Sequence, residues 1–125
     1  MKYNVAVVGA TGLVGSTMLK VLSEENFPID NLYLFSSKKS AGKTINYCGK
    51  DYTVEELKED SFDGRNIKVA LFSAGGSVSE KFAPLAAKAG AIVVDNSSAF
   101  RMDPEVPLVV PEINPEDIKL NKGII

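Results

Sequence analysis

The 125-residue chain contains no histidine, and its only cysteine is Cys48. Histidine is the side chain that most often moves protons near neutral pH, so the usual general base is missing. One cysteine cannot form a disulfide within the chain, which fits a reducing compartment. The sequence therefore predicts no catalytic residue among these 125 residues, and we expect no metal site.

Long apolar runs and an excess of basic charge are also missing. No apolar run approaches the ~20 residues that a membrane-spanning helix needs. The net charge is -2, whereas a nucleic-acid partner requires a basic face. The first residues lead straight into a strand pattern rather than a signal peptide. We expect one cytoplasmic globular domain, residues 1–125, with no membrane and no nucleic-acid partner.

A glycine-rich motif, Gly-Ala-Thr-Gly-Leu-Val-Gly at positions 9–15, is the most informative feature that is present. It follows the apolar run 5–8 and opens a helical pattern. A strand, a glycine turn and a helix N-terminus together form a phosphate site, because backbone N–H groups and the helix dipole both favour an anion. The alternative is a tight turn that uses glycine for steric reasons alone. The context favours nucleotide binding.

Apolar runs alternate with helical patterns along the chain. The predicted strands are residues 4–8, 31–36, 68–72 and 91–94, and residues 106–110 are expected to be extended. The predicted helices are about 12–23 and 77–88. Ser77 or Ser79 can cap the second helix and Gly90 can close it. Residues 44–48 and 52–54 predict an antiparallel hairpin around Gly49-Lys50-Asp51. The alternation predicts an α/β fold with a Rossmann-like, doubly wound, mainly parallel sheet. Residues 122–125 read as a turn and the start of another strand, so we expect the chain to be cut there.

The loop after the second predicted strand carries hydroxyl groups and three lysines but no acid over residues 35–43. A domain that selects NAD usually has an acid here, which binds the ribose 2′-hydroxyl. Hydroxyls and lysines suit a 2′-phosphate instead, through charge-assisted hydrogen bonds. A solvated polar loop is the alternative. The position of the loop favours NADP as the cofactor.

Three further features are candidates for a functional role: the segment Ser73–Ser77, Arg101 and Cys48. The small residues of Ser73–Ser77 either leave room for a cofactor or form a tight turn. Arg101 can clamp an anion, or it can be a surface arginine. Cys48 lies in the predicted hairpin, away from any setting that would stabilise a thiolate, so we do not expect it to be catalytic.

Several of these stretches together resemble the aspartate-semialdehyde dehydrogenase family. They lie at residues 7–15, 40–43, 70–77, 93–102 and 106–114, and the most specific block is 95–114. The resemblance covers essentially the whole chain and implies the N-terminal NADP-binding domain of the bacterial branch. The reaction it implies is NADP-dependent reduction of aspartyl phosphate to aspartate semialdehyde and phosphate, through a cysteine thioester.

The resemblance also implies roles for individual residues. Ser37, Lys39 and Ser40 would face the 2′-phosphate, and Lys39 stands where the family often has arginine, so a bidentate contact becomes a point charge. Arg101 matches the arginine for the substrate phosphate. The remaining implied cofactor contacts are Gly9, Thr11, Gly12, Leu13 and Val14 at the glycine motif, Ser73, Ala74 and Gly75 after a strand, and Asn96.

The family's nucleophilic cysteine follows a Gly-Ile-Ile stretch like residues 123–125, and its catalytic histidine and substrate domain come later. The resemblance thus implies a cofactor domain without its reaction centre. It implies a homodimer or homotetramer for the full-length enzyme, in the biosynthesis of lysine, threonine and methionine. Two alternatives remain: the related N-acetyl-glutamyl-phosphate reductase, and a nucleotide-sensing domain that catalyses nothing.

Overall fold

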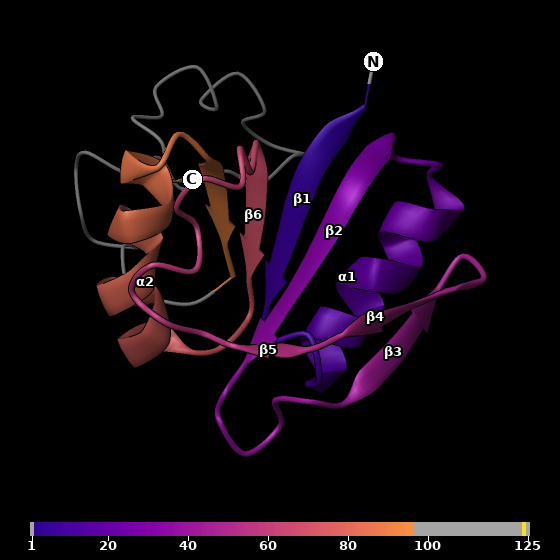
Figure 1. Cartoon of the computed structure of the whole chain (residues 1–125), viewed down its shortest axis with the longest axis horizontal. Coiled ribbons are helices and arrows are strands. Elements are labelled where there is room, and N and C mark those ends of the chain that lie inside the picture. The colour runs from indigo at the N-terminus through magenta and orange to yellow at the C-terminus, as the bar shows by residue number, and fades with distance from the viewer. Residues whose placement is uncertain (1, 97–123, 125) are drawn as a thin grey trace.

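The computed structural model describes residues 2–96 and residue 124 (Figure 1). Arg101 and the extended stretch expected at 106–110 lie outside these residues. The described elements, in chain order, are β1 (Tyr3–Val8), α1 (Leu13–Glu24), β2 (Ile29–Ser36), β3 (Thr44–Tyr47), β4 (Lys50–Thr53), β5 (Glu55–Glu56), β6 (Val69–Phe72), α2 (Gly76–Lys88) and β7 (Ile92–Asp95).

Five of the strands form one parallel sheet in the order β5-β2-β1-β6-β7. The chain starts in the middle of this sheet, builds one side with β2 and β5, and then crosses back to add β6 and β7. Strands β3 and β4 form a separate antiparallel hairpin. This arrangement confirms the predicted Rossmann-like α/β fold.

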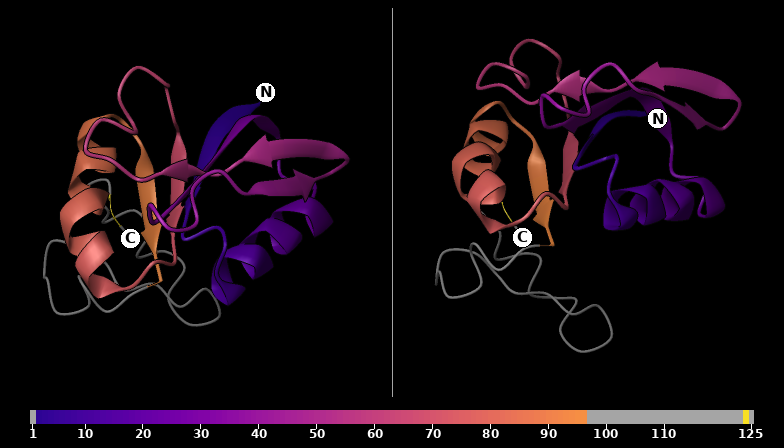
Figure 2. Two further views of the ribbon diagram at one scale, coloured as in Figure 1. Left: turned by 60° about the horizontal axis from the view of Figure 1, so that its bottom comes forward. Right: turned by 90° about the horizontal axis from the view of Figure 1, so that it is seen from below.

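The two helices cover opposite faces of the sheet, as the two views of Figure 2 show. Alternate residues of β1 point to opposite faces, because side chains in a strand alternate. Val5 and Val7 pack with Leu19 of α1, whereas Ala6 and Val8 pack in a second cluster with Ala83 of α2. Both clusters are closed to water at β1, where the residues from Val5 to Val8 are 0% exposed. The centre of the sheet is therefore buried on both faces, as a doubly wound fold requires, whereas Ile92 and Val94 of β7 are exposed.

Helix α2 is not capped by a serine. Its N-cap is Gly75, with φ 93°, and no side chain in the described part of the chain caps the helix there. Ser79 is fully buried and its hydroxyl donates to a carboxylate oxygen of Asp95 at 2.8 Å, so it ties the helix to β7 instead. The predicted closure at Gly90 is confirmed: its φ is 103° and the next N–H bonds back to Ala86.

The hairpin turn begins one residue earlier than predicted. Its two central residues are Cys48 and Gly49, with φ values of 51° and 84°, and Lys50 already pairs with Tyr47. Two residues of positive φ are what a tight hairpin turn of this twist needs, and glycine supplies only the second.

Strand β5 was not predicted, because two glutamates carry no strand signal. At the other end of the chain, Ile124 forms a parallel bridge with Val93, in agreement with the strand expected there.

Gly15 fixes how closely α1 approaches the turn before it. A Cβ at this position would overlap the Gly9 carbonyl oxygen and lie 3.0 Å from the Cα of Ala10. These neighbours are backbone atoms of the glycine motif, so they have little freedom to move aside. The third glycine of the motif is thus a packing requirement between the helix and the turn.

We expect Gly15→Ala to lower the free energy of unfolding by about 1–3 kcal/mol, the usual cost of overpacking a tight contact. Urea denaturation followed by circular dichroism measures it. Gly76→Ala is the matched control, because a Cβ there meets nothing within 4 Å. Equal stabilities for the two variants would contradict the packing role of Gly15.

Candidate functional site

The candidate site lies where the carboxyl ends of β1 and β6 meet. The strand order reverses between these two neighbours, since β2 lies on one side of β1 and β6 on the other. Open parallel sheets bind ligands at such a reversal. Gly9 follows β1 and Ser73 follows β6, and the Ser73 hydroxyl donates to the Val8 carbonyl at 3.2 Å. This contact holds the two strand ends together at the edge.

Gly9 is the glycine whose conformation the turn requires. Its φ is 87°, and a Cβ would lie 3.0 Å from the backbone of Ser73. Gly12 has φ -81° and ψ 172°, which other residues can adopt, and a Cβ there would meet only the Gly9 carbonyl, at 3.5 Å. A positive φ is therefore not the reason for glycine at position 12. What it provides is open space above the start of α1.

Both helices begin at this edge with their N-termini free of side-chain caps. Among the described residues, no side chain caps the helix starts at Gly12 and Gly75, and neither first turn carries an acid. The first N–H groups of a helix have no partner within it, and the helix dipole places partial positive charge there. Each helix start is therefore suited to a negatively charged group.

A cavity of about 390 Å³ opens beside these helix starts. It brings together Gly9, Thr11, Gly12, Ser37, Ser73 and Ala74 from the predicted set. The first two belong to the turn after β1, and Ser37 follows β2. The wall on the α2 side is apolar, with Leu57, Val78 and Phe82 packed against the core cluster of that face.

Six of the predicted contacts do not line this cavity. Leu13 and Val14 form the first turn of α1, and Leu13 is 84% exposed. Gly75 begins α2, and the N–H of Asn96 donates to Phe72 at 3.0 Å at the same sheet edge. The other two are Lys39 and Ser40, in the turn after β2.

The structure adds two charged residues that sequence reasoning missed, Lys38 and Glu56. Lys38 lies in the loop with three lysines, one position before Lys39, which the resemblance implied as the 2′-phosphate contact. Glu56 belongs to β5 and reaches the cavity only because β5 pairs with β2. Nothing in the local sequence around Glu56 indicates that pairing.

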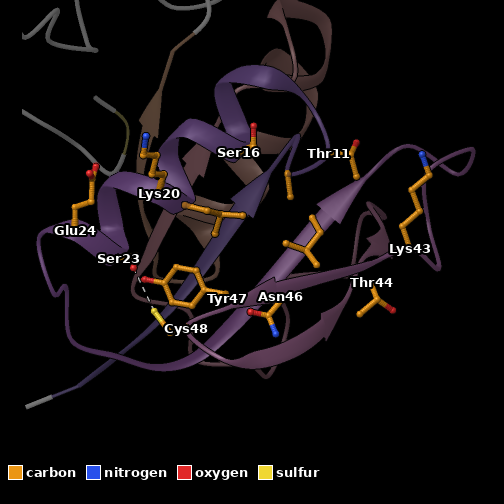
Figure 3. A pocket seen from close by; sticks show the side chains of 13 residues that line it. Thr11, Ser16, Lys20, Ser23, Glu24, Lys43, Thr44, Asn46, Tyr47 and Cys48 are labelled. Carbon is orange, nitrogen blue, oxygen red and sulfur yellow. Dashed lines mark hydrogen bonds between the residues drawn. The ribbon is translucent and has the colours of Figure 1, made fainter.

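Cys48 lies at a different place. It lines a second cavity, of about 570 Å³, between α1 and the β3–β4 hairpin (Figure 3). Its thiol is exposed and donates to the Ser23 hydroxyl at 3.4 Å, near the end of α1. The pKa of Tyr47 is raised, first by partial burial of its phenol and second by the neighbouring Cys48. Thr11 borders both cavities. Cys48 does not line the cavity beside the helix starts, as expected from the sequence.

The described residues contain neither a metal-binding cluster nor a membrane-spanning helix. Within residues 2–96 and 124, no three acidic, cysteine or histidine side chains gather in a way that could hold a metal ion. In the same part of the chain, neither helix is long and apolar enough to cross a membrane.

The chain matches known proteins over its whole length. The family described as semialdehyde dehydrogenase, NAD binding domain, matches residues 4–121. The aspartate-semialdehyde dehydrogenase of Aquifex aeolicus is 62% identical over 128 residues, which cover 100% of this chain and 37% of that protein. The chain thus spans little more than a third of that relative.

Two solved structures are also similar. Aspartate semialdehyde dehydrogenase II from Vibrio cholerae, complexed with ASA, superposes with a TM-score of 0.93 at 51% identity, over 100% of this chain and 41% of that one. The Candida albicans enzyme with NADP gives 0.80 at 28% identity, over 95% of this chain and 36% of that one. With its glycine turn, parallel sheet and edge cavity in agreement with these matches, the chain belongs to the semialdehyde dehydrogenase family, as a nucleotide-binding domain of it.

Proposed function

We propose that this chain binds NADP and serves as the cofactor domain of an aspartate-semialdehyde dehydrogenase. The observation that carries the proposal is the cavity at the strand reversal, beside the uncapped start of α1. A dinucleotide fits its chemistry: the free helix N–H groups suit a pyrophosphate, and the apolar wall of Leu57, Val78 and Phe82 suits an adenine ring. The Candida albicans relative was solved with NADP, which supports the choice of cofactor.

Different residues would bind different parts of the cofactor. The N–H groups of Thr11, Leu13 and Val14 would hold the pyrophosphate at the start of α1. Gly12 would leave room for it, since its own N–H already donates to the Gly9 carbonyl at 3.1 Å. Ser37 and Lys38 line the cavity where the 2′-phosphate would lie, and Lys39 and Ser40 follow in the same turn. The strand-end residues Ser73, Ala74, Gly75 and Asn96 would lie along the remainder of the cofactor.

The whole protein's reaction is part of the proposal. The bound cofactor would supply hydride for the reduction of aspartyl phosphate to aspartate semialdehyde and phosphate. In this chain Arg101 would hold the substrate phosphate by charge-assisted hydrogen bonds. We further propose a cytoplasmic homodimer or homotetramer that acts in lysine, threonine and methionine biosynthesis. The identity to aspartate-semialdehyde dehydrogenases supports this function over an acetylglutamyl-phosphate reductase or a sensor domain.

The chain should bind NADP more tightly than NAD, because Ser37 and Lys38 can hold a 2′-phosphate. Lys38→Ala should weaken NADP binding by about 1–3 kcal/mol and leave NAD nearly unchanged, since one hydrogen bond to a charged group is lost. Lys39→Ala, whose side chain is outside the cavity lining, should have a smaller effect. Calorimetric titration with both cofactors measures this. Tighter binding of NAD by the unaltered chain would refute the assignment of NADP.

Gly12→Val should abolish cofactor binding while the domain stays folded. The backbone at position 12 is extended, so valine can adopt it, but its methyl groups would fill the space above the helix start. Thr17→Val is the control: it places the same side chain on an exposed position of α1 and should bind normally. A folded Gly12→Val protein that still titrates NADP would show that the pyrophosphate lies elsewhere.

The 125-residue chain alone should not catalyse phosphate-dependent reduction of NADP by aspartate semialdehyde. It has no histidine, and Cys48 is outside the cofactor cavity. The assay follows NADPH absorbance, with the Aquifex aeolicus relative as the positive control. Cys48→Ser should make no difference to the result. Turnover by the chain that disappears in Cys48→Ser would mean that Cys48 is a nucleophile after all.

A further inference from the structure

Glu56 places a carboxylate on the wall of the proposed cofactor cavity. Strands β2 and β5 are parallel, and their paired residues are Phe35 with Glu55 and Ser36 with Glu56. Paired residues of neighbouring strands point to the same face, and successive residues alternate. Phe35 packs in the cluster on the α2 face, so Glu55 shares that face, and Glu56 shares the opposite one with Ser36.

The neighbours of Glu56 hold it firmly in this position. The Glu55 carboxylate accepts two hydrogen bonds from Arg65, at 2.8 and 3.0 Å, and the guanidinium lies 4.9 Å from the centre of the Tyr33 ring. On the other side, the N–H of Leu57 donates to the Ser36 carbonyl at 2.9 Å. Within the part of the chain that the structure describes, no hydrogen bond or ion pair engages the Glu56 side chain. Its charge is therefore available to a ligand.

The two walls of the cavity differ in chemistry. Leu57, Val78 and Phe82 form the apolar wall on the α2 side, which suits an adenine ring. Ser36, Ser37 and Lys38 form the polar wall, at the end of β2, where a dinucleotide fold places the ribose 2′ position. The register between β2 and β5 puts Glu56 on the side of Ser36.

We propose that Glu56 is a specificity-determining residue, whose carboxylate faces the ribose 2′ position and opposes Lys38. This inference rests on the proposed cofactor function. A carboxylate accepts a hydrogen bond from the 2′-hydroxyl of NAD. It repels a 2′-phosphate, which carries a charge of about -1.5 to -2 at pH 7. Lys38 attracts the same phosphate, so the two residues partly cancel and the preference for NADP stays moderate.

Glu56→Gln tests the proposal, because it removes the charge and keeps the size of the side chain. Calorimetric titrations with NADP and with NAD give the ratio of the two dissociation constants for each protein. We expect the variant to bind NADP about ten-fold more tightly and NAD no more tightly. Salt at 0.5 M should reduce this shift, since Glu56 is only half-buried and its charge is partly screened. Glu25→Gln removes an equal charge at the far end of α1 and should leave the ratio unchanged.

Three results separate the possible failures. If Glu56→Gln alters the binding of NADP and NAD equally, Glu56 does not face the 2′ position and the inference is wrong. An unchanged ratio in a variant with unchanged urea denaturation refutes it as well. If the unaltered chain binds neither cofactor, the proposed function itself fails. Should Glu56→Gln fold poorly, Glu56→Ser provides the same comparison of the two cofactors.

Discussion

The contact between Gly15 and the Gly9 carbonyl determines how the rest of the edge is arranged. It lets α1 lie so close to its preceding turn that no side chain fits between them. The start of the helix then lies beside the end of β1, next to the cavity that Thr11 and Gly12 line. Gly9 completes the arrangement on the other side, since its missing side chain lets the end of β6 approach at Ser73. Two glycines thus bring together a strand end, a neighbouring strand end and a helix start.

The alternation of side chains along the strands gives the cavity its two chemical walls. The same alternation that sends Val5 and Val7 to one helix and Ala6 and Val8 to the other continues beyond the buried centre of the sheet. At the end of β2 it separates Phe35, on the apolar side, from Ser36, on the polar side. At the end of β5 it separates Glu56 from Leu57, the residue that follows the strand, in the same way. A ligand with one apolar and one charged part, such as an adenine nucleotide, matches this division.

The described charges lie where a dinucleotide domain can use them. Both helix starts lack acids, so the partial positive charge of each is not neutralised by its own first turn. Lys38 and Glu56 carry opposite charges on one cavity lining. Glu55, by contrast, is neutralised by a two-point contact with Arg65, and the Glu55 hydrogen bonds raise the pKa of that guanidinium. One of the two adjacent glutamates therefore stabilises the sheet edge, and the other remains open to a ligand.

The sequence by itself determined the strands β1, β2, β6 and β7, both helices and the glycine turn, because apolar periodicity and glycine spacing are local signals. It also placed Ser37 and Ser73 at strand ends that share an edge, since parallel strands end on the same side. Only the tertiary structure decided that Lys38 rather than Lys39 lines the cavity, that Ser79 pairs with Asp95 instead of capping α2, and that Glu56 reaches the site. The last two depend on partners distant in the sequence: 16 residues separate Ser79 from Asp95, and Glu56 belongs to a strand that forms only by pairing with β2. Local pattern cannot specify such pairings, because they arise only when the sheet is assembled.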